Sequence, residues 1–114
     1  MNKVTLLLSA AMLMCGLNAA QAAGNGNPAA GQEKSATCQA CHGADGNQTL
    51  DNTYPKLGGQ YADYLQQSLR AYRSGTRKNP VMMGFAAQLS DQDIADLAAW
   101  YASQDGLNII PKKP

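Results

Sequence analysis

The sequence predicts a small all-α domain, and three observations support this fold class. Between residues 60 and 74, large side chains recur at the three- and four-residue spacing of a helix face; they are Tyr61, Tyr64, Leu65, Leu69 and Tyr72. The run Ser90-Asp91-Gln92-Asp93 has the form of a capping box, which begins a helix. No run of alternating β-branched residues is present to form a strand.

The remaining elements follow from turn and capping residues. Asn27 followed by Pro28 is typical of a helix start, so a first helix is expected from residue 28 to about residue 38. Gly31 inside it costs about 1 kcal/mol relative to alanine, and we expect close packing against another helix to offset that cost. Residues 43–59 are expected to be irregular, and Gly75 to end the 60–74 helix.

The last third of the chain is expected to contain a loop and then a helix. Residues 77–89 include Pro80 and Gly84 and are expected to form the loop. The final helix begins after Ser90 and presents one apolar face, formed by Ile94, Leu97, Ala98 and Tyr101.

Residues 1–22 have the three parts of an export signal. Lys3 supplies a positive start, residues 4–14 are apolar, and Ala20-Gln21-Ala22 fits a cleavage site. The apolar stretch is too short to span a bilayer stably. We therefore expect a cleaved signal peptide at 1–22, a periplasmic domain at 23–114, and no membrane span in the mature chain. A lipid anchor at Cys15 is the alternative, although the preceding Met14 is larger than lipidation prefers.

The charge balance argues against nucleic-acid binding. Without Lys3, the chain has eight basic and eight acidic side chains, whereas nucleic-acid binding asks for a clear basic excess. The charges are unevenly placed, with a basic group at residues 70–78 and an acidic group at residues 91–96. Ordinary solvated helix faces are one interpretation; the other is that the basic group steers an acidic partner.

The pentapeptide Cys38-Gln39-Ala40-Cys41-His42 is the candidate functional motif of the chain. C-x-x-C-H is the spacing that attaches a haem covalently to a chain. Cysteines three positions apart project to the same side of a helical turn, so both thiols can add to the vinyl groups on one porphyrin edge. The adjacent His42 then becomes the proximal iron ligand. The sequence therefore predicts one covalent haem c, with its iron.

Two other uses of C-x-x-C, a zinc site and a dithiol redox pair, fit this sequence less well. A zinc site would need two further Cys or His ligands, but His42 is the only histidine, no cysteine follows Cys41, and Cys15 lies in the segment expected to be removed. A dithiol redox pair of the thioredoxin type would lie in a βαβ pattern, which is absent. A haem would also fill the core of a domain that has few aromatic side chains.

An iron that only carries electrons prefers a second axial ligand from the protein. No second histidine exists, so a methionine thioether is the available strong ligand. Met82 and Met83 are the only methionines after the signal, and one of them is expected to bind iron. The alternative for either side chain is to fill a gap in the core.

Four stretches in combination resemble the small class I cytochromes c of bacteria, most closely single domains of dihaem periplasmic cytochromes c. They are residues 38–43, Tyr54-Pro55-Lys56-Leu57, residues 77–82 and residues 89–94. The resemblance implies helices with long loops wrapped around one haem. In the family, the ligand methionine is followed by six residues and then Leu-Ser, a frame that Met82 fits, with Met83 as the alternative.

The resemblance implies two further roles. The backbone carbonyl of Pro55 would accept a hydrogen bond from the proximal imidazole and fix its orientation. Gly31 and the pair Trp100-Tyr101 would lie at the crossing of the first and last helices.

The expected function is a periplasmic one-electron carrier of a respiratory chain, not an enzyme. Its partners would be redox proteins: a donor such as a quinol-oxidising complex or dehydrogenase, and an acceptor such as a terminal oxidase or reductase. A peroxidase-like haem enzyme or gas binder is the alternative, but it requires a labile sixth position. A dithiol oxidoreductase would apply only if the protein binds no haem.

Overall fold

The computed structural model describes residues 25–107, and the helices in this range confirm the all-α prediction. They are α1 (Pro28–Lys34), the 3-10 helix η1 (Ser35–Thr37), α2 (Gln39–His42), α3 (Ala62–Ser74), α4 (Pro80–Ala86) and α5 (Asp91–Ser103). No strand occurs between residues 25 and 107. The expected signal peptide lies outside the described residues. In the described part of the chain, no helix has the length and apolar character needed to cross a membrane.

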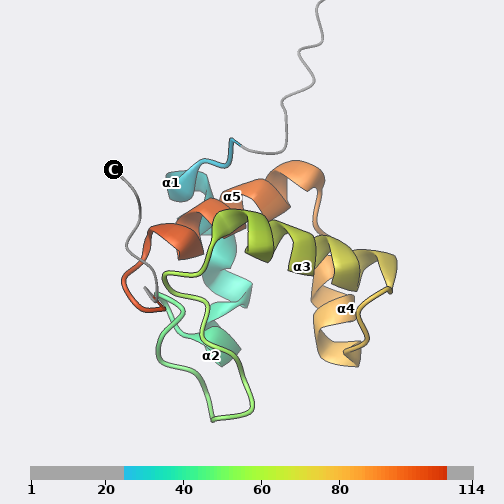
Figure 1. Cartoon of the computed structure of the whole chain (residues 1–114), viewed down its shortest axis with the longest axis horizontal. Coiled ribbons are helices and arrows are strands. Elements are labelled where there is room, and N and C mark those ends of the chain that lie inside the picture. The colour runs from blue at the N-terminus through green and yellow to red at the C-terminus, as the bar shows by residue number, and fades with distance from the viewer. Residues whose placement is uncertain (1–24, 108–114) are drawn as a thin grey trace, which may run out of the picture.

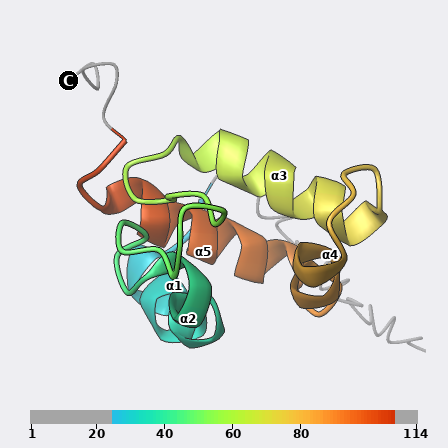
Figure 2. The ribbon, with the colours of Figure 1, turned by 90° about the horizontal axis from the view of Figure 1, so that it is seen from below.

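Helix α5 is the centre of the packing. It packs against α1 on one side and against α3 on the other, and α4 packs against the end of α3 (Figure 2). Helix α2 continues from α1 through η1. Figure 1 shows α2 and α4 on opposite sides of the molecule, both below α3 in that view. The segment between α2 and α3 forms long loops beside α2.

The predicted helix boundaries at Asn27, Gly75 and Ser90 are confirmed. The Asn27 side chain accepts a hydrogen bond from the Ala29 amide at 2.9 Å. Ser90 and Asp93 form the reciprocal capping box, with the Asp93 amide donating to Ser90 Oγ at 3.0 Å and the Ser90 amide donating to Asp93 Oδ2 at 2.9 Å. Gly75 ends α3 with φ of 79°, in the left-handed region that favours glycine.

The prediction of one continuous helix over residues 28–38 is wrong. Helix α1 ends at Lys34, and the chain tightens into the 3-10 turn η1. Ser35 Oγ donates to the carbonyl of Gln32 at 2.7 Å, and the Cys38 amide donates to the carbonyl of Ser35 at 2.8 Å. The second of these bonds has the three-residue spacing of a 3-10 helix, which is tighter than the four-residue spacing of an α-helix. As a result, Cys38 begins a new helix, α2, rather than ending the first one.

The prediction of a loop over residues 77–89 is also wrong, because this segment contains α4. The Asn79 side chain caps the helix by accepting hydrogen bonds from the amides of Val81 and Met82, each at 3.1 Å. Pro80 occupies the first helical turn, where it has no amide hydrogen to leave unpaired. The same Asn-Pro signal that starts α1 therefore starts α4.

The expected close approach at Gly31 is confirmed at the crossing of α1 and α5. A Cβ at Gly31 would collide with the Asp96 carbonyl oxygen and would lie 2.8 Å from Trp100 Cβ. Gly31 is buried. Only glycine therefore allows the two helices to cross at this distance.

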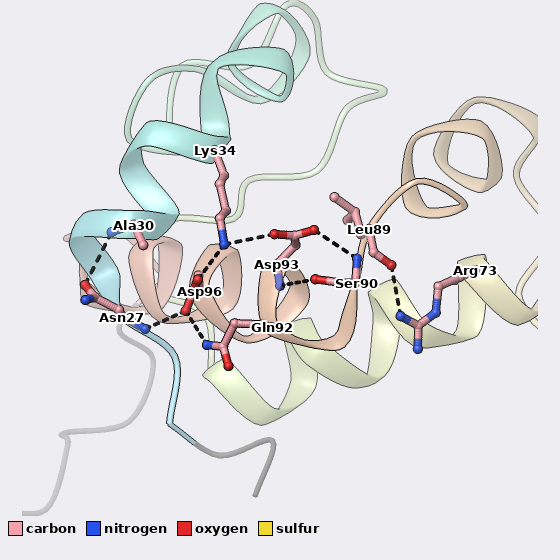
Figure 3. A network of polar contacts seen from close by, with 9 residues as sticks. All are labelled: Asn27, Ala30, Lys34, Arg73, Leu89, Ser90, Gln92, Asp93 and Asp96. Atoms are coloured by element: carbon pink, nitrogen blue, oxygen red, sulfur yellow. Dashed lines mark hydrogen bonds and ion pairs between the residues drawn. The ribbon is translucent and has the colours of Figure 1, made fainter. Parts of the chain in front are cut away.

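A polar network reinforces this crossing (Figure 3). The Asp96 carboxylate is 3% exposed and accepts three hydrogen bonds: from the Asn27 amide at 2.8 Å, Lys34 Nζ at 2.6 Å and Gln92 Nε2 at 2.7 Å. Burial alone would raise the pKa of Asp96, but the hydrogen bonds and the lysine charge together hold the pKa below its usual value. The buried charge is therefore compensated.

The apolar core lies between α3 and α5. Leu65, Ala98 and Tyr101 form its central cluster, and Ile94 and Leu97 are also buried, as the predicted face of the last helix requires. The large side chains that predicted α3 are not all directed into this core. Leu65 is buried, whereas Tyr61 and Tyr64 are about half exposed, at 50% and 49%. Their bulk therefore remains at the surface.

Candidate haem-attachment site

One turn of backbone holds the two cysteines and the histidine together. Cys38 is the N-terminal cap residue of α2, and its carbonyl accepts hydrogen bonds from the amides of Cys41 at 3.3 Å and His42 at 3.0 Å. Both cysteines are partly buried free thiols. Gly43, with φ of 85°, ends the helix directly after His42. The arrangement has the spacing at which two thiols can reach one edge of a planar group.

The His42 ring is buried and oriented by the loop that precedes α3. His42 is 5% exposed, and its Nδ1 lies 2.8 Å from the Pro55 carbonyl oxygen. A carbonyl can only accept a hydrogen bond, so Nδ1 is the donor and carries a proton; in the neutral ring, Nε2 then keeps its lone pair. A neutral imidazole with a free Nε2 is the form that binds a metal ion.

Tyr54 supplies a second contact to the ring that the sequence did not reveal. Its ring meets the His42 ring edge to face, with centroids 6.4 Å apart and planes at 88°. Its position next to Pro55 was the only available signal. The loop thus holds the imidazole through one hydrogen bond and one aromatic contact.

The Cys38 thiol lies against the core. It packs on the cluster of Leu65, Ala98 and Tyr101. Burial raises the pKa of the Cys38 thiol, and the Thr37 hydroxyl opposes this effect. Dithiol oxidoreductases depend on a cysteine whose pKa is lowered, because the thiolate is the nucleophile. The raised pKa therefore does not favour the dithiol interpretation.

Helix α4 carries both candidate methionines, and their surroundings differ. Each side chain is partly buried. The amide of Met82 is fixed by the Asn79 cap. The methyl carbon of Met83 lies 3.7 Å from the position that a Cβ on Gly75 would take, so Met83 packs towards the turn after α3. No hydrogen bond or ring contact is present between α4 and His42 in the described part of the chain, and Figure 1 shows α2 and α4 apart.

These donors fit a covalently held haem. The chain offers two thiols on one turn, an imidazole with a free Nε2, and a thioether on a separate helix. Among residues 25–107, no group of three or more His, Cys, Asp and Glu side chains converges in a way that would hold a metal ion by itself. The donor set therefore suits an iron that brings its own equatorial ligands, as a porphyrin does.

The chain matches a known protein family. Residues 28–105 match the family described as Cytochrome c. The chain is 55% identical over 83 residues to cytochrome c-554(548) of Halomonas halodenitrificans, which covers 70% of this chain and 99% of that protein.

Longer relatives also match. Cytochrome c4 of Pseudomonas aeruginosa is 47% identical over 104 residues, covering 91% of this chain and 49% of that protein. Among solved structures, reduced recombinant cytochrome c4 from Pseudomonas stutzeri superposes with a TM-score of 0.68 at 42% identity, covering 72% of this chain and 47% of that one. The chain thus spans about half the length of these cytochromes c4.

Proposed function

Because this chain belongs to the cytochrome c family, we propose that it is a periplasmic one-electron carrier in which His42 and Met82 bind the haem iron. The class I fold and the covalent haem c follow from family membership and from the structural match. We propose in addition the His/Met ligation, the periplasmic location and the redox partners. The observation that carries it is the buried His42 ring, which lies on the same helical turn as two thiols and whose Nδ1 is hydrogen-bonded to the Pro55 carbonyl, so that Nε2 is left to bind a metal.

Four side chains would hold the group. Cys38 and Cys41 would form the two thioether bonds, His42 would bind the iron through Nε2, and Met82 would bind it through sulfur. The bound haem supplies a ferrous/ferric couple, and Met/His ligation raises its potential relative to more basic ligand pairs. Packing of Met83 towards Gly75 supports Met82 as the ligand, with Met83 as the alternative.

The chain's own residues keep this site rigid. The hydrogen bond to Pro55 fixes the imidazole plane and increases its basicity as a ligand. Burial of His42 excludes water from the ring. The two ligand-bearing helices are held by separate contacts, α2 through the Cys38 carbonyl and α4 through the Asn79 cap. Little therefore needs to rearrange when the protein gains or loses one electron.

The proposal extends to export and partners. Residues 1–22 would be removed as a signal peptide on passage to the periplasm, which leaves residues 23–114 as the working domain. The donor would be a quinol-oxidising complex or dehydrogenase, and the acceptor a terminal oxidase or reductase. Such electron-transfer encounters are usually small and transient.

A spectroscopic redox titration tests the proposal. The protein is produced in a host with a haem-attachment system and titrated against potential. We expect a low-spin spectrum, a one-electron transition, and haem that stays on the chain after denaturation. The Cys38→Ala/Cys41→Ala double variant should retain no haem after denaturation. A high-spin spectrum of the ferric protein, together with ready uptake of carbon monoxide by the reduced protein, would instead support the enzyme or gas-binding alternative. A colourless wild-type protein would support a dithiol function.

A further inference from the structure

The charges that are not paired within the fold are distributed unequally over the molecule. Residues 25–107 contain six Lys and Arg side chains. Lys34 pairs with Asp93 and Asp96, and Arg73 with Asp91. Of the other four, three lie at the C-terminal end of α3 and in the turn that follows: Arg70, Arg77 and Lys78.

Five acidic side chains among the described residues form no ion pair, and four of them gather elsewhere; the fifth, Glu33, lies on α1. Asp45 and Asp51 lie in the loops between α2 and α3, Asp63 lies in the first turn of α3, and Asp105 follows α5. Figure 1 shows these loops at the opposite end of α3 from the turn that leads into α4. The molecule therefore has an asymmetric charge distribution, and its positive end lies at the turn between α3 and α4. Such asymmetry orients a charged partner before contact.

The basic end is open and partly preorganised. An open cleft of about 490 Å³ lies there, lined by Gln67, Arg70, Ala71, Arg73, Ser74 and Thr76. The Arg77 guanidinium lies 4.7 Å from the centroid of the Tyr72 ring, and its Nη1 donates to Ser68 Oγ at 3.2 Å. These contacts fix Arg77 while its charge stays exposed. Lys78 makes no hydrogen bond or ion pair with any described residue.

An apolar stripe begins three residues after Lys78. Val81, Gly84, Phe85 and Gln88 occur at helical spacing along α4 and its C-terminal end and line an open groove of about 300 Å³. Val81 is 55% exposed and Phe85 is 46% exposed. Leaving such apolar side chains exposed to water is unfavourable. Three peptide units separate Lys78 from Val81, so their Cα atoms are at most about 11 Å apart.

We propose that these side chains form one docking surface, the α3–α4 face, defined by Arg70, Arg77, Lys78, Val81 and Phe85, and that its occupant is a redox protein with acidic side chains around an apolar contact. An apolar centre with a charged rim is the usual anatomy of a protein interface. The inference rests on the proposed function, since Val81 is adjacent to the proposed ligand Met82. A protein is favoured over an anionic membrane because residues 25–107 carry more acidic than basic side chains.

Matched variants of the haem-containing protein test this surface. The probe is a purified blue-copper protein with an acidic face, and the measurement is the second-order rate of electron transfer by stopped flow. Lys78→Gln is compared with Lys56→Gln, since each removes one exposed lysine charge. Val81→Ser is compared with Leu50→Ser, since each removes one exposed aliphatic side chain, Leu50 being 65% exposed. Phe85→Ser replaces Val81→Ser if the latter changes the visible spectrum.

The expected pattern separates charge from apolar contact. At low ionic strength, Lys78→Gln should lower the rate by about 2- to 5-fold, and the loss should disappear in high salt. Val81→Ser should lower the rate at both ionic strengths. Lys56→Gln and Leu50→Ser should leave it near the wild-type value. If the two variants of each pair changed the electron-transfer rate equally, the proposal that the α3–α4 face is the docking surface would be wrong.

Two controls separate this proposal from the proposed function. Tris(phenanthroline)cobalt(III), a small cationic oxidant, should react with every variant. If this oxidant reacts with the wild-type protein but the two variants of each pair transfer electrons to the blue-copper protein at the same rate, the docking surface is wrong. The proposed function as an electron carrier would then still hold. If neither oxidant accepts an electron from the reduced wild-type protein, the carrier function itself fails. Sedimentation showing a dimer that Lys78→Gln dissolves would assign the face to a second copy of the chain and overturn the stated partner.

Discussion

His42 Nδ1 lies 2.8 Å from the carbonyl oxygen of Pro55, and this single bond determines which ring nitrogen is free. The acceptor is a backbone atom, so no side-chain substitution at position 55 can remove it directly. A substitution can only loosen the loop that carries the carbonyl. The prediction for Pro55 therefore concerns how rigidly its carbonyl is held, and not the loss of the hydrogen-bond acceptor.

Pro55→Gly should loosen this hydrogen bond without removing its acceptor. Glycine has far more backbone freedom than proline, so the carbonyl will be held less firmly against Nδ1. The imidazole should become a less basic ligand, and the reduction potential should rise. Exchange of the Nδ1 proton with solvent, followed by NMR, should become faster. An unchanged potential with unchanged proton exchange would contradict the role given to this carbonyl.

Met82→Ala and Met83→Ala should have different spectra although the residues are neighbours. Loss of Met82 removes the proposed sixth ligand, so the ferric protein should become high-spin and lose the weak far-red band of iron–sulfur ligation. Loss of Met83 removes packing towards Gly75 and should leave the band in place. Absorption spectra of the oxidised proteins decide the assignment, and the reverse pattern would make Met83 the ligand.

Asp96→Asn should destabilise the domain strongly. The substitution leaves Lys34 without a buried partner and places an amide where three donors converge. We expect the free energy of unfolding to fall by about 2–4 kcal/mol, measured by urea denaturation with circular dichroism. Asp91→Asn is the control, because it also breaks an ion pair, but the Asp91 side chain is 71% exposed. Its effect should be much smaller, and equal losses would contradict the importance of burial.

Acid should weaken the same network within a defined range of pH. Hydrogen bonds from Lys34 and Ser90 lower the pKa of Asp93 from 3.8 to about 2. A carboxyl group whose pKa is lower in the folded state stabilises the fold above its unfolded value and loses that contribution as pH falls through the folded value. Stability should therefore decline between about pH 4 and pH 2. In Asp93→Asn this part of the decline should be reduced, which unfolding curves at several pH values will measure.

Gly31→Ala and Gly84→Ala should change stability in opposite directions. A methyl group at Gly31 would collide with the Asp96 carbonyl, so the free energy of unfolding should fall by about 2–3 kcal/mol. A Cβ at Gly84 meets nothing within 4 Å, and alanine favours the helix, so stability should rise by up to about 1 kcal/mol. Urea denaturation of both variants tests the crossing of α1 and α5. If Gly31→Ala left the free energy of unfolding unchanged, the two helices would have to be able to move apart.

Local signals predicted the helix boundaries at Asn27, Gly75 and Ser90 well, but they predicted the end of α1 and the segment around Met82 poorly. Asn27, Gly75 and Ser90 act through bonds to residues within a few positions, so the chain nearby contains the information. Asn79-Pro80 gives the same signal, but the glycine and proline content of residues 77–89 suggested a loop. Packing against α3 stabilises α4, which is only 7 residues long and would be marginal alone.

The sequence alone determined the class of fold, the cysteines and histidine proposed to hold a haem, and the start of the last helix, because each depends on spacing along the chain. Tertiary structure decided the rest. It brought the Asn27 amide to Asp96 across 69 positions and turned Met83 towards Gly75. It also placed the Pro55 carbonyl at His42, 13 positions away, a contact that the family resemblance implied but local spacing did not. Those contacts join segments whose approach depends on how α1, α3 and α5 pack, and local spacing does not encode that geometry.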